Sequence, residues 1–121
     1  MKRIAVWTGR ILSTLVLVPL VFGVMMSFSG NPKIAEGMAH AGIPLSLMKT
    51  LMVLELSVIV LYAIPATSVV GAILFTGYMG GAICTHLRLG ESVFIQTLLP
   101  ILAWLGLYLR EPRLRSILPL R

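Results

Sequence analysis

Glu55 is the residue whose position most strongly suggests chemistry, because no other charged side chain lies between Lys49 and His86. A carboxyl in the middle of a membrane-spanning helix is costly and normally faces the interior of the helix bundle. We expect no Lys, Arg or His at its depth, so the carboxyl should be neutral and hydrogen-bonded to a hydroxyl group. Two roles fit: a carboxyl that handles protons or polarises a ligand in an internal cavity, or a structural link between two helices.

Thr76 and Tyr78 are the expected partners of Glu55. Glu55 lies ten residues before Pro65, which places it about 15 Å from a turn at this proline if both flanking segments are helices. Counting the same rise beyond Pro65 reaches Thr76, with Tyr78 close above it. Tyr78 also lies away from the expected membrane surfaces, so its hydroxyl needs a polar neighbour. Glu55, Thr76 and Tyr78 therefore form the predicted polar site within the membrane.

His86 and Arg88 close the same apolar stretch and form a second candidate polar site, at its outer end. They could bind a lipid headgroup, another anion or a quinone-type head, although simple anchoring at the membrane surface also explains them. Glu36 and His40 are four residues apart, but two ligands do not complete a metal site. The sequence has no nucleotide-binding loop, metalloprotease motif or haem-attachment motif. It predicts no metal, no identified cofactor and no catalytic residue, and it favours a protein that is not an enzyme on its own.

A row of small residues runs along the stretch that carries Thr76. Residues four apart share a face of a helix, and rows of small residues allow helices to approach closely in a membrane. We expect this face to pack against neighbouring helices, and Cys84, the only cysteine, to serve as a packing residue. The row comprises Ser68, Ala72, Thr76, Gly80 and Cys84, with Gly77, Gly81 and Thr85 beside it.

The composition indicates that the solvent for this chain is a lipid bilayer. Of its 121 residues, 58% are hydrophobic and only 12% are charged, whereas soluble domains average ~25% charged residues. The mean hydropathy is +0.99. The net charge of +6 comes from residues at the ends of apolar segments, with no aromatic residues interleaved to stack bases. Nucleic acid is therefore not an expected partner, and anionic lipid headgroups are.

Turn signals divide the chain into one transmembrane domain of four helices. The stretch from 56 to 85 has no charged residue; as a single helix it would be ~45 Å long, so a turn at Pro65 fits a hydrocarbon core of ~30 Å better. Ser92 is the expected N-cap of the last helix, and a short helix between the first two spans should end at Gly42. The predicted fold is an all-α, antiparallel four-helix bundle, with spans at about residues 4–28, 45–63, 66–86 and 92–109.

The distribution of basic residues predicts the orientation in the membrane. With four spans, seven basic residues share one side and three the other, so the richer side should be cytoplasmic. We expect both termini there, in a bacterial cytoplasmic (inner) membrane. The seven are Lys2, Arg3, Arg10, Arg110, Arg113, Arg115 and Arg121; the three are Lys33, Lys49 and Arg88.

The stretch from Gly71 to Arg88, with its run Thr76-Gly77-Tyr78-Met79-Gly80-Gly81-Ala82 followed by His86, resembles the DoxX-like family of small membrane proteins. Gly42-Ile43-Pro44, Glu55 and Pro65 fit the same family. The resemblance implies a four-helix membrane protein. The name of the family derives from a membrane component of an archaeal quinol-oxidising system, and relatives resemble accessory subunits of redox enzymes.

Two functions of different class follow. The first is a non-catalytic accessory subunit of a quinone-linked complex, associating with a partner subunit or with further copies of itself. The second is a binder or carrier of a lipid, quinone or other small molecule that uses Glu55. In a subunit, the row of small residues should be only partly filled within the chain. In a carrier, a cavity open to one side should reach Glu55.

Overall fold

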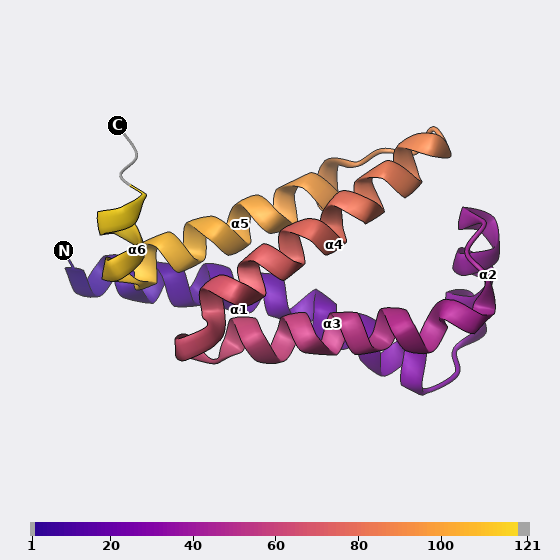
Figure 1. Ribbon diagram of the computed structural model, residues 1–121, viewed down its shortest axis with the longest axis horizontal. Helices are drawn as coiled ribbons and strands as arrows, with labels where there is room; N and C mark the ends of the chain where they lie inside the picture. Colours follow the sequence, from indigo (N-terminus) through magenta and orange to yellow (C-terminus); the bar gives the residue numbers. More distant parts are fainter. Residues whose placement is uncertain (1, 119–121) are drawn as a thin grey trace.

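The computed structural model describes residues 2–118, and every regular element in that range is a helix. Four long helices lie lengthwise, with α2 at one end and α6, together with the start of α1, at the other (Figure 1). In chain order the elements are α1 (Lys2–Phe28), α2 (Pro32–Ala41), η1 (Leu45–Leu47), α3 (Met48–Ala63), η2 (Pro65–Thr67), α4 (Ser68–Arg88), α5 (Phe94–Arg110) and α6 (Pro112–Ile117).

Three of the described segments are long and apolar enough to cross a membrane: Lys2–Phe28, Leu45–Ala63 and Pro65–Arg88. The helix α5 is also apolar but has 17 residues. Large apolar side chains cover the outside of the described part, including Leu15, Phe22 and Ile101. A soluble protein of this size does not expose so many of them, and lipid is the environment that suits them. The chain is therefore an integral membrane protein.

The short helix α2 ends as the sequence predicts, whereas α5 begins later than predicted. Gly42 follows α2 with a φ of 75°, a left-handed conformation that closes a helix. The residue before α5 is Val93, not the predicted Ser92, whose hydroxyl accepts a weak hydrogen bond of 3.4 Å from the Phe94 N–H. The chain stays outside a helix until this point because the Glu91 N–H is held against the end of α4.

Glycines at two positions let α1 and α5 pack in close contact. A Cβ atom on Gly9 would lie 2.8 Å from the backbone nitrogen of Arg110, and one on Gly106 would lie 2.9 Å from the Gly9 carbonyl oxygen. Real Cβ atoms do not approach other atoms so closely, so neither position accepts a larger residue without a shift of the backbone. These two glycines bring together helices that are far apart in the sequence.

The predicted packing of the small row on α4 holds only for its first part within this chain. Ser68 and Ala72 are buried. A Cβ added at Gly77, Gly80 or Gly81 would meet nothing within 4 Å, and Cys84 is exposed. The physical reason is the helix pitch: each step of four residues turns by ~40°, so the row winds by ~160° from Ser68 to Cys84 and leaves the inner face.

Candidate functional site

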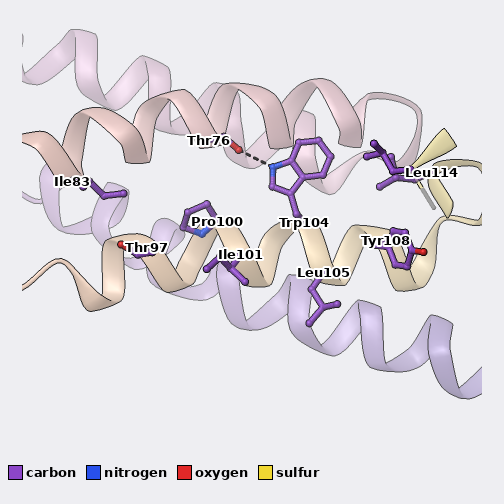
Figure 2. Close-up of a pocket in the computed structure, with 10 residues that line it drawn as sticks. Thr76, Ile83, Thr97, Pro100, Ile101, Trp104, Leu105, Tyr108 and Leu114 are labelled. Carbon is purple, nitrogen blue, oxygen red and sulfur yellow. Dashed lines mark hydrogen bonds between the residues drawn. The ribbon is translucent and has the colours of Figure 1, made fainter. Parts of the chain in front are cut away.

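A hollow of about 630 Å³ lies between α4 and α5. Figure 2 shows Trp104 of α5 reaching toward Thr76 of α4. The indole Nε1–H donates a hydrogen bond of 2.8 Å to the Thr76 hydroxyl, which itself donates to the Ala72 carbonyl. The walls are otherwise mostly apolar, so the groove suits an apolar ligand. The lining residues are Thr76, Ile83, Thr97, Pro100, Ile101, Trp104, Leu105, Tyr108, Leu114 and Leu118.

The structure divides the predicted Glu55 site. Glu55 is half-buried on α3, and a Cβ added to Gly23 of α1 would lie 3.4 Å from its Oε1 atom. The Glu55 carboxyl and the Tyr78 phenol are close enough to interact electrostatically. Thr76 instead bonds Trp104, on the side of α4 that faces α5. Tyr78 therefore lies within electrostatic range of Glu55, whereas Thr76 belongs to the groove between α4 and α5.

A second hollow, of about 510 Å³, reaches Tyr78 from the end of the molecule where α2 lies. It is bounded by α2, the start of α3 and the later part of α4. Glu55 is not among its lining residues, which are Lys33, Ile34, Gly37, Met38, Ala41, Ile43, Leu51, Tyr78, Gly81, Ala82, Thr85 and His86. Glu55 also does not line the groove between α4 and α5.

His86 and Arg88 lie near the end of α4, beside α2. The Nδ1 atom of His86 is 2.9 Å from Glu91 Oε1, and His40 Nε2 is 3.5 Å from Glu91 Oε2. Arg88 donates a hydrogen bond to the carbonyl oxygen of Ala41 at the end of α2. These contacts tie α2 to the end of α4. No group of three or more potential metal-binding side chains occurs within the described part of the chain.

A polar network that the sequence analysis missed joins α1, α3, α4 and α5. Arg110, at the end of α5, donates from Nε to the Ser13 hydroxyl at 3.1 Å, and from Nη2 to the Tyr62 carbonyl and the Ser68 hydroxyl at 3.2 and 3.3 Å. Tyr62 is buried, with an exposed fraction of 1%. Its hydroxyl has partners inside the protein, which is why it can be buried.

The outer face of α4 is the second surface of interest, and we define it as Val70, Ile73, Gly77, Gly80, Gly81 and Cys84. All six residues are exposed in the single chain. The three glycines leave a shallow surface without side chains, next to the groove that contains Thr76 and Ile83. The sequence analysis identified these small residues, but their environment depends on which way α4 is turned.

Comparison with known proteins gives one match. The model of the family described as DoxX-like matches residues 11–109, which include Glu55, Thr76 and Trp104 of the groove, and the outer face of α4. No curated protein and no solved structure matches the chain.

Proposed function

The chain belongs to the DoxX-like family, and we propose that it is a non-catalytic subunit of a membrane complex, which binds a transmembrane helix of a partner subunit through the outer face of α4. The proposed architecture is a single antiparallel bundle of four spans in a bacterial inner membrane, with both termini in the cytoplasm. The complex that the family resemblance favours is a quinone-linked redox system.

Four spans are supported by the length and ends of α5. Its 17 residues correspond to ~25 Å of helix, and ~17 residues is the lower limit for a span. The helix ends at Arg110, and Arg113 and Arg115 follow in α6. Placing these arginines on the same side as Lys2 and Arg3 satisfies the preference of basic residues for the cytoplasm.

The observation that carries the proposal is the empty space beside Gly77, Gly80 and Gly81. Added Cβ atoms there would meet nothing within 4 Å. Lipid tails solvate apolar helices well, so membrane helices associate where small residues let the backbones approach. Gly77 and Gly81 are four residues apart and Gly77 and Gly80 are three apart, so all three lie on one face of the helix and offer this close approach. A subunit with a partner helix is expected to have such a surface only partly filled within its own chain.

The test is purification of the full-length protein from membranes in mild detergent, followed by mass spectrometry of the bound proteins. We expect one membrane protein to be retained by the parent and lost from the Gly80→Leu and Gly77→Leu variants, which fill the outer face. Val53→Leu on α3, also at an exposed position, is the control and should retain it. Since the outer face is empty in the single chain, the glycine variants should melt within ~1 kcal/mol of the parent.

Three outcomes would contradict the proposal. Retention of the same protein by both glycine variants would place the interface elsewhere. If no protein copurifies with the parent and is lost from these variants, the outer face of α4 binds no partner subunit. Oxidative cross-linking of Cys84, which is exposed, to Cys84 of another copy in native membranes would identify a homo-oligomer as the occupant.

A second candidate function, binding of a quinone or another apolar molecule, is favoured by the groove between α4 and α5. Its volume of about 630 Å³ and its mostly apolar lining suit a ring with a hydrocarbon tail. Trp104 lies in its wall, whereas Trp7 does not. A short-chain quinone should therefore quench the fluorescence of the Trp7→Phe variant with saturation, and that of Trp104→Phe without it. Equal, unsaturated quenching of both variants would exclude this function.

A further inference from the structure

The start of α1 and the end of α5 lie at the same end of the molecule (Figure 1). A hollow of about 370 Å³ lies there between α1, α3 and α5. Two guanidinium groups border it, from Arg10 and Arg110, together with the hydroxyl groups of Ser13, Thr14 and Tyr62. The lining residues are Trp7, Arg10, Ser13, Thr14, Leu17, Tyr62, Ala63 and Arg110.

Both arginines are held in place by aromatic rings. The Arg110 guanidinium lies 5.1 Å from the centre of the Tyr62 ring, and the Arg10 guanidinium lies 5.1 Å from that of the Trp7 ring. The hydrogen bonds of Arg110 to Ser13, Ser68 and the Tyr62 carbonyl use Nε and Nη2. Within residues 2–118, Nη1 has no hydrogen-bond partner. A guanidinium fixed in this way loses little freedom when it binds an anion.

Within residues 2–118, no carboxylate forms an ion pair with either arginine. Among the described residues, the only ion pairs within 4 Å join Glu91 to His40 and His86, at the opposite end of the molecule. Glu111 is the only acidic residue near this end, and it caps α6 by accepting from the Arg113 N–H. Half-buried Arg110 therefore has neutral oxygens as its protein partners, and its charge remains available to an external anion.

An apolar groove begins where the basic hollow ends. About 340 Å³ is open along α1, and the lining residues are Leu17, Val18, Val21, Phe22 and Met25. Leu17 borders both hollows. The combined surface offers two arginines at the end of the bundle and an apolar track that runs from them along the outside of α1. A molecule that fits both parts has an anionic head and a hydrocarbon tail.

We propose that this surface is a binding site for an anionic glycerophospholipid, whose phosphate group contacts Arg10 and Arg110 and whose acyl chain lies along the groove on α1. Guanidinium groups bind phosphate oxygens with directed, charge-assisted hydrogen bonds. The proposed orientation places this end at the cytoplasmic leaflet, where anionic lipids attract basic residues. The site is separate from the outer face of α4, so failure of the partner interface would not remove it; only the assignment to the cytoplasmic leaflet rests on the orientation proposed above.

The test is native mass spectrometry of the full-length protein in neutral detergent, titrated separately with phosphatidylglycerol, phosphatidylcholine and inorganic phosphate. We expect one phosphatidylglycerol to remain bound at concentrations where phosphatidylcholine and phosphate do not. Arg10 is exposed and its guanidinium stacks on Trp7 of its own helix, so Arg10→Gln should fold. One basic residue near a membrane surface contributes roughly a fivefold change in affinity, which is the loss expected for Arg10→Gln.

Arg3→Gln is the matched control, since it removes the same charge from an exposed position outside the hollow. It should bind phosphatidylglycerol like the parent. Equal losses for Arg3→Gln and Arg10→Gln would show general surface attraction instead of a site. Equal binding of phosphatidylcholine would remove the role of the negative headgroup, and binding of inorganic phosphate with the same affinity would identify a free anion as the ligand. Each of these results would overturn the proposal.

Discussion

Ser13 in α1 and Tyr62 in α3 share a buried hydrogen bond of 2.9 Å, although 49 residues separate them in the sequence. The direction of this bond follows from its neighbours. The Tyr62 hydroxyl has one proton and donates it to the Ala103 carbonyl at 2.6 Å, so Ser13 must donate to Tyr62. Arg110 in turn donates to Ser13. One directed chain of hydrogen bonds therefore runs from Arg110 through Ser13 and Tyr62 to Ala103.

Removing the Tyr62 hydroxyl should weaken the bundle. Tyr62→Phe leaves the Ser13 hydroxyl and the Ala103 carbonyl with one partner fewer in a buried place, and such a loss costs ~1–3 kcal/mol. Thermal unfolding in detergent measures it. Thr85→Ala is a suitable control, because that hydroxyl bonds only the Gly81 carbonyl of its own helix. Equal stability of Tyr62→Phe and the control would show that the network contributes nothing.

The contact between α1 and α5 should not tolerate a methyl group. A Cβ on Gly106 would lie 2.8 Å from the Ser13 Oγ atom and 2.9 Å from the Gly9 carbonyl oxygen, so Gly106→Ala should lower the free energy of unfolding by ~1–3 kcal/mol. Gly77→Ala adds the same group in open space and should be neutral or slightly stabilising, since alanine favours helix. The reverse order of stabilities in detergent would disprove this packing.

Thr76 should matter for stability through Trp104 rather than through Glu55. Thr76→Val removes the acceptor of the indole N–H at nearly constant shape, and we expect a loss of ~1 kcal/mol. Thr76→Ser keeps the hydroxyl and should retain most of the stability. The emission of Trp104, measured with Trp7 replaced by Phe, should shift in Thr76→Val but not in Thr76→Ser. A change of emission in neither variant would contradict the hydrogen bond.

The orientation in the membrane can be tested with two engineered cysteines in a Cys84→Ala background. Lys33→Cys should react with an impermeant maleimide added to intact cells, because α2 is expected outside. Arg113→Cys in α6 should react only after the membrane is opened. Labelling of position 113 alone on intact cells would show that the topology is the reverse of the one proposed. Labelling of both positions on intact cells would rule out the four-span arrangement.

Height along the helices could be estimated from the sequence, but direction around them could not. The rise per residue places Thr76 and Tyr78 near the level of Glu55, and Tyr78 lies within electrostatic range of Glu55 in the structure. Thr76 and Tyr78, however, are two residues apart, which turns them by ~200° on a helix. Only one of them can therefore face Glu55; in the structure Thr76 bonds Trp104 of α5, and Tyr78 is the one within electrostatic range of Glu55.

The rest of the site depends on contacts for which no local pattern exists. Arg110 and Ser13 are 97 residues apart, and a serine in an apolar span does not reveal its partner. The number of apolar stretches and the basic residues at their ends indicated a helical membrane protein, because length and charge are properties of each segment alone. Which glycines are covered and which remain open follows from how the segments turn toward each other, as Gly106 and Gly80 show.

The close fit of Gly9 against Gly106 has a consequence for biosynthesis. The ribosome makes α1 before the other described helices and α5 after α4, so α1 enters the membrane long before its glycine-lined contact surface can be covered. Lipid must occupy that surface until α5 arrives, and it must leave when the two backbones come together. Assembly of the bundle is therefore completed after translation has passed residue 110. If the ribosome stalls before α5, the nascent chain has a first helix whose contact surface around Gly9 is still uncovered and accessible to the membrane-protein quality-control machinery.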